Sequence, residues 1–104
     1  MINLNAEKLE QTAAAAFALA SNSRLWQTAI TKAWGILRDS PFWHMGGDGA
    51  LVILSPDSSE LYEVTAGRCE RIDGERRVAC KAFARSQPCK HRAARRLLVR
   101  YQGA

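Results

Sequence analysis

The N-terminal part of the chain has apolar residues at the spacing of an amphipathic helix. Asn5 is a typical N-cap residue, and Glu7 and Glu10 lie in the turns that follow it. These features predict a helix over residues 6–20 whose apolar positions are Leu9, Ala13, Ala16, Phe17 and Ala20.

A second helical repeat follows directly. Ser21–Ser23 interrupts the first pattern and supplies a new N-cap, and the next helix should end near Arg38, before Asp39–Pro41. The short connection predicts an antiparallel helix pair. Its second member carries one wide apolar stripe, formed by Trp26, Ala29, Ile30, Ala33, Trp34 and Leu37, which we interpret as core packed against a sheet.

The middle of the chain changes to short apolar runs separated by turn residues, which is typical of β-strands. Residues 42–45 and 50–54 flank a Gly-rich turn and predict a first hairpin, and residues 60–64 predict a third strand. Strand alternation places Tyr62 and Val64 on one face of that strand. Asp73-Gly74 is a strong two-residue turn signal between residues 68–72 and 75–80. We therefore expect a meander of four or five antiparallel strands.

The last predicted element is a helix with two distinct faces. Its apolar face contains Ala94, Leu97, Leu98 and Tyr101. Its other face contains Arg92, Arg95, Arg96 and Arg100. This second face is either a solvated surface or a binding surface. The chain is thus predicted to be α+β, with an N-terminal antiparallel helix pair, an antiparallel β-meander and a C-terminal helix.

Residue types that bind metals are concentrated between the predicted sheet and this helix. Cys89 and His91 would point roughly 200° apart inside a regular helix, so they can share a metal only at a helix entrance, and Pro88 is typical of such an entrance. Cys80 lies shortly before them. A hairpin around Asp73-Gly74 can bring the remaining cysteine, Cys69, beside Cys80. The hypothesis is a structural Zn²⁺ site made by Cys69, Cys80, Cys89 and His91; the alternative is three thiols that bind no metal.

Cys80-Lys-Ala-Phe, together with Pro88-Cys-Lys-His91 and the Arg-Ala-Ala that follows it, resembles the SWIM zinc finger, whose pattern is Cys-x-Cys, a variable gap and Cys-x-His. The resemblance covers roughly residues 60–101. The chain departs from the pattern at the first ligand, where Val78 stands in place of a cysteine and Cys69 is the nearest candidate. At 104 residues the chain should form a single domain, large enough to bury a modest core. Within it we expect a helical hairpin (1–40) and a SWIM-like ββα zinc module (41–104), and the resemblance suggests a small protein of phage or bacterial type.

The charge distribution points towards a polyanionic partner. Residues 1–67 have four Lys or Arg against seven Asp or Glu, whereas residues 68–104 have eleven against three. The basic half is the half with the predicted metal site, and such asymmetry is typical of proteins that bind nucleic acid or an acidic protein surface. The candidate binding residues are Arg76, Arg77, Lys81, Arg85, Lys90, Arg92, Arg95, Arg96 and Arg100.

Two functions remain open from the sequence. The first is a nucleic-acid-binding module, most simply for DNA; the second is a protein-interaction or inhibitory module, from a phage or mobile element, that presents the same basic face to an acidic protein. No nucleophile is paired with a base and an orienting group, so an enzyme is not expected. Three cysteines argue against a secreted disulfide framework, and no apolar run approaches the length of a membrane span. These features predict a cytoplasmic protein.

Overall fold

The computed structural model describes residues 5–56, 59–85 and 87–103. It is an α+β fold, as the sequence predicted. The helices α1 (Ala6–Leu19) and α2 (Arg24–Asp39) form the antiparallel pair. Each begins at the expected cap, because the side chain of Asn5 accepts a hydrogen bond from the Lys8 amide at 3.0 Å and the Ser23 hydroxyl accepts one from the Trp26 amide at 3.2 Å.

The sheet is an antiparallel meander of five strands in the order β1-β2-β3-β4-β5. The strands are β1 (Trp43–Met45), β2 (Leu51–Leu54), β3 (Leu61–Val64), β4 (Cys69–Asp73) and β5 (Arg76–Ala79). Asp73 pairs with Arg76, so the last turn is Gly74-Glu75 and not the predicted Asp73-Gly74. Gly74 has φ +61°, a conformation that glycine adopts without the steric cost of a side chain.

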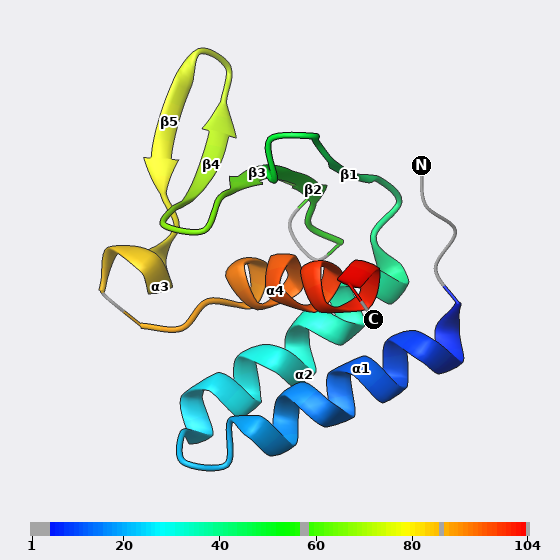
Figure 1. The fold of residues 1–104 in the computed structure, drawn as a ribbon. Helices are drawn as coiled ribbons and strands as arrows, with labels where there is room; N and C mark the ends of the chain where they lie inside the picture. The colour runs from blue at the N-terminus through cyan, green and yellow to red at the C-terminus, as the bar shows by residue number, and fades with distance from the viewer. Residues whose placement is uncertain (1–4, 57–58, 86, 104) are drawn as a thin grey trace.

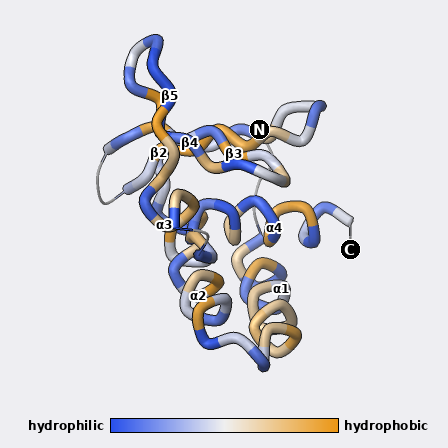
Figure 2. Tube along the Cα trace, turned by 90° about the vertical axis from the view of Figure 1, so that its left-hand side faces the viewer, coloured by the Kyte–Doolittle hydropathy of each residue, from blue (hydrophilic) through white to orange (hydrophobic). Residues whose placement is uncertain are grey.

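Two further helices follow the sheet. The short helix α3 (Lys81–Ala84), which the sequence pattern did not predict, begins directly after β5, and α4 (Lys90–Gly103) is the expected C-terminal helix. Figure 1 shows α4 between the sheet and the α1–α2 pair, while the β4–β5 hairpin extends away from the helices. Figure 2 shows the same arrangement from the side, with hydrophilic and apolar segments alternating along α4.

The core lies on both sides of α4. The buried face of α4 contains Ala94, Leu97, Leu98 and Tyr101, as predicted. This face packs against α2 and α1 and, on the side of the sheet, against β3. The interpretation of the α2 tryptophan stripe as core packed against the sheet is therefore wrong, since α2 packs mainly on α4 and α1. Trp26 and Trp34 are only partly buried, and each has an arginine over its ring: Arg96 at 4.2 Å and Arg38 at 5.0 Å.

Candidate metal centre and basic helix face

The four residues predicted as metal ligands lie together. One ligand atom from each of Cys69, Cys80, Cys89 and His91 can be chosen so that all four lie within 4.8 Å of one another. All four side chains are largely buried, with His91 only 4% exposed. The structure thus brings together donors from three different parts of the chain, a convergence that hydrophobic packing alone does not require.

Each ligand is placed by a definite local structure. Cys69 is the first residue of β4, and its carbonyl accepts a hydrogen bond from the Cys80 amide at 3.1 Å, which joins the two ends of the β4–β5 hairpin. Cys80 is the N-cap of α3 and its sulfur accepts from the Phe83 amide at 3.4 Å. The sulfur of Cys89 accepts from the Arg92 amide at 3.2 Å, in the first turn of α4. Two of the sulfurs therefore lie at helix N-termini, where negative charge is stabilised.

His91 is positioned by an aromatic neighbour, Tyr62, that the sequence placed on the same strand face as Val64 without giving it a role. The rings of Tyr62 and His91 stack with their centroids 3.9 Å apart and 19° between their planes. Neither ring nitrogen of His91 has a hydrogen-bond partner among the described residues, although both are buried. A buried, unpartnered imidazole is costly, and a metal ion would satisfy one of its nitrogens.

The cysteine side chains influence one another strongly. The hydrogen bond from Cys69 holds the pKa of the Cys80 thiol far below its ordinary value, with a further contribution from Cys89. Conversely, hydrogen bonds to Cys80 and Cys89, together with burial, raise the pKa of the Cys69 thiol. The protons of the three thiols are therefore coupled. A divalent cation displaces such protons when it binds.

The donor set fits a tetrahedral metal ion. Zinc bonds to cysteine sulfur at about 2.3 Å, which puts neighbouring ligand sulfurs roughly 3.8 Å apart. The spacing of at most 4.8 Å in this cluster is close enough to hold a metal ion after small side-chain adjustments. Three thiolates and a neutral imidazole around a divalent cation carry one net negative charge. A cleft of about 760 Å³ beside the cluster is lined by three lysines that can balance it, Lys32, Lys81 and Lys90, and by Arg71, which is paired with the Glu60 carboxylate at 3.8 Å.

The four arginines of α4 form the second feature of interest, which we call the arginine face (Arg92, Arg95, Arg96 and Arg100). The side chains of Arg92 and Arg95 contact the turns at one end of the sheet: Arg95 donates to the carbonyl of Gly49 at 2.8 Å, and Arg92 donates to that of Ala66 at 3.4 Å. Among the described residues no carboxylate lies within ion-pair distance of any of the four. The pKa of Arg96 is lowered by burial and then by the charges of Arg92 and Arg95.

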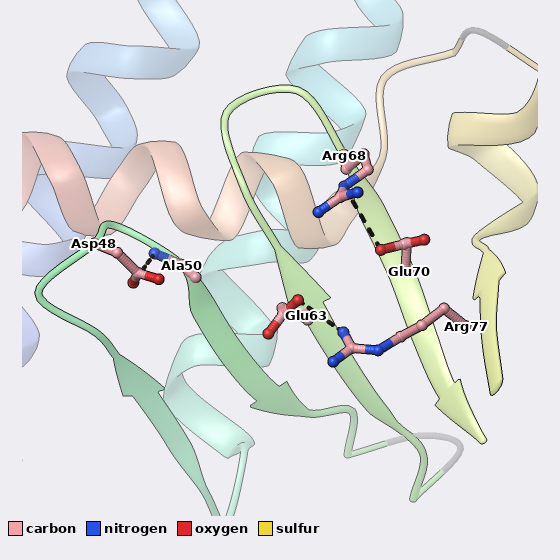
Figure 3. A network of polar contacts seen from close by, with 6 residues as sticks. All are labelled: Asp48, Ala50, Glu63, Arg68, Glu70 and Arg77. Carbon is pink, nitrogen blue, oxygen red and sulfur yellow. Dashed lines mark hydrogen bonds and ion pairs between the residues drawn. The ribbon is translucent and has the colours of Figure 1, made fainter. Parts of the chain in front are cut away.

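The other predicted binding residues lie in several different places. Arg77 lies on the face of the sheet that points away from α4, where its guanidinium donates to the Glu63 carboxylate at 2.7 Å (Figure 3). Figure 3 also shows the nearby ion pair between Arg68 and Glu70, 3.6 Å long. Arg76 and Arg85 are exposed on β5 and after α3, and Lys81 and Lys90 line the cleft beside the metal-ligand cluster. Sequence reasoning grouped these cations because they are close in the chain, and it missed Lys32 and Arg71, which join the cleft from distant positions.

The fold and the cluster define a class: a small α+β domain with a buried Cys₃His group able to hold a metal ion. No protein-family model, curated protein or solved structure matches this chain. Over the residues that the structure describes, no helix combines the length and the apolar character that a membrane crossing requires.

Proposed function

We propose that the chain is a SWIM-like binding module whose fold is held together by a structural zinc ion. The observation that carries this proposal is the convergence of three sulfurs and one imidazole within 4.8 Å. Thiolate-rich, four-coordinate sites are characteristic of zinc among the common divalent metals. Four protein ligands leave no position for a catalytic water, so the ion would be structural. The resemblance to SWIM modules favours a binding module over an enzyme.

Elemental analysis of protein purified without chelator tests the zinc site. We expect about one zinc per chain, and less in variants in which a ligand cysteine is replaced by serine. Protein that is fully folded and contains no metal would disprove the site. Iron in place of zinc would keep the ligand set and disprove the identity of the ion.

We further propose that the arginine face of α4 binds nucleic acid, most simply DNA. Four guanidinium groups on one helix face, none paired with a carboxylate among the described residues, supply charge and hydrogen-bond donors suited to phosphates. The contacts of Arg92 and Arg95 with backbone carbonyls leave further N–H groups on each guanidinium for a ligand.

Fluorescence anisotropy with labelled duplex DNA, single-stranded DNA and RNA tests this second proposal. The affinity should fall steeply with added salt, because each phosphate contact releases about one counterion. No binding to any of the three at low salt would exclude nucleic acid.

The second candidate function, an acidic protein partner for the same basic face, is favoured by an apolar groove that adjoins Arg96 and Arg100.

A further inference from the structure

An apolar groove of about 290 Å³ lies between α1, α2 and α4. It shares no lining residue with the cleft beside the metal-ligand cluster, so it is a separate feature. The groove exists because three of its lining positions are alanines, Ala16, Ala20 and Ala93, where larger side chains would fill the space between the helices. Its volume is at the lower limit of small-molecule pockets and suits one or two side chains of a partner.

The edge of the groove is unusually apolar for a surface. Leu19, at the end of α1, lines it and is 69% exposed. A single exposed leucine is ordinary, but an exposed leucine at the mouth of an apolar groove marks a surface that a partner can cover.

Positive charge borders the same groove. Arg96 and Arg100 both line it, and neither has a carboxylate partner among the residues that the structure describes. The guanidinium of Arg96 lies over the Trp26 ring at 4.2 Å, which holds it beside the groove. The site therefore combines an apolar cavity with two cations, and its complement is an apolar group flanked by negative charge.

We propose that this groove docks an acidic segment of a partner protein, which inserts one aliphatic or aromatic side chain between α1 and α4 and places its carboxylates against Arg96 and Arg100. The inference rests on the second proposed function and gives it a location and a chemistry. A nucleic acid fits less well: bases stack on open aromatic faces, whereas Arg96 covers the face of Trp26 and alanine and leucine side chains form much of the groove.

A fluorescein-labelled peptide of aspartates and glutamates around a central Phe-Leu pair is the probe. A companion peptide has serines in place of that pair and keeps the same charge. Anisotropy titration of the zinc-loaded full chain should give binding of the Phe-Leu peptide at least about tenfold tighter than that of the serine peptide. Equal affinity for the two peptides would overturn the proposal, because the groove would then add nothing to surface charge.

Two variants test the groove itself. Ala16→Met fills the space between α1 and α4, and Leu19→Ser removes the apolar edge without altering the core. Each variant should lower the affinity for the Phe-Leu peptide by about tenfold. Leu25→Ser is the matched control, because Leu25 is 58% exposed on α2 and lies outside the groove. Metal content and melting temperature establish that each variant is folded. Unchanged binding by Leu19→Ser and Ala16→Met would overturn the proposal.

The charge contribution has its own pair of variants. Arg100→Gln should lower the affinity for the Phe-Leu peptide several-fold. Arg24→Gln should not, because Arg24 is exposed at the first position of α2 and does not line the groove. Binding of the Phe-Leu peptide that depends on Arg100 but not on Leu19 or Ala16 would overturn the groove inference and leave the second proposed function standing. No binding of either acidic peptide would overturn both. Loss of single-stranded DNA binding in Ala16→Met would instead assign the groove to a base and overturn the protein partner.

Discussion

The ring of Tyr62, in β3, stacks on the ring of His91, in the first turn of α4, with 3.9 Å between centroids and 19° between planes. The hydroxyl of Tyr62 donates to the Glu60 carboxylate at 3.2 Å, which fixes the tyrosine from its far end. This stack joins the sheet to the only metal-ligand candidate that is not a cysteine. It makes the orientation of His91 depend on the sheet, as neighbouring groups commonly orient metal ligands.

Tyr62→Ala should therefore weaken metal binding without removing a ligand. Loss of a group that orients a metal ligand typically costs about 10–100-fold in metal affinity, and we expect a value in this range. Competition with a chromophoric chelator measures it. Tyr62→Phe is the matched control, since it keeps the ring and removes the hydroxyl that donates to Glu60. If Tyr62→Ala bound metal as tightly as Tyr62→Phe, the stack would have no role in the metal site.

Cys69→Ser tests the ligand that departs from the SWIM pattern. We expect zinc affinity to fall sharply and the melting temperature to drop, because metal binding in such sites contributes directly to folding free energy. A chelator should lower the melting temperature of the unaltered chain and have little further effect on this variant. Thermal unfolding with and without chelator, followed by circular dichroism, provides the comparison.

The two N-terminal helices could be predicted to within about a residue because their signals are local. Asn5 and Ser23 mark the starts of α1 and α2, and the apolar repeat marks their length. The turn between β4 and β5 is displaced by one residue from the prediction, because the pairing of Asp73 with Arg76 is set by the whole sheet. Helix α3 is too short for any periodicity, and the Cys80 cap that begins it is visible only in the fold.

The clustering of the three cysteines with His91 was predictable because cysteines are few and their chemistry is specific. The basic surface was harder to predict, because the place of a charged side chain depends on the side of the strand to which it points. Arg77 pairs with Glu63, and these two residues come together only through the register of β3, β4 and β5. Residues adjacent in sequence, such as Arg76 and Arg77, consequently point to different surroundings.

Gly49 offers a sharp test of how α4 is joined to the sheet. It has φ +84°, and a Cβ at this position would lie 3.2 Å from the Arg95 guanidinium, whose Nε donates to the Gly49 carbonyl. Gly49→Ala should lower the free energy of unfolding by about 1–3 kcal/mol, through the strained backbone and the displaced arginine. Gly47→Ala is the control, since nothing lies within 4 Å of its Cβ and its φ is not positive; its effect should stay within about 0.5 kcal/mol. Urea unfolding of both variants measures the difference.

The arginine face can be separated from the other basic residues by substitution. Changing Arg92, Arg96 and Arg100 together to glutamine should weaken nucleic-acid binding by several kcal/mol, at about 1–3 kcal/mol for each charge-assisted contact. The slope of log affinity against log salt should become shallower by up to about 3. Anisotropy titrations over a series of salt concentrations measure both quantities.

The matched control is the double variant Arg76→Gln, Arg77→Gln, which removes positive charge from the β4–β5 hairpin. Because Arg77 is already paired with Glu63 on the face of the sheet away from α4, this change should reduce nucleic-acid affinity much less than the helix variant does. Zinc content and melting temperature should stay close to those of the unaltered chain in the helix variant, since Arg96 and Arg100 are exposed and the ligand side chains are untouched. Equal losses of affinity per charge removed in the two variants would mean that total charge, and not the arginine face, determines binding. A larger loss from the hairpin variant would move the nucleic-acid site from α4 to β4 and β5.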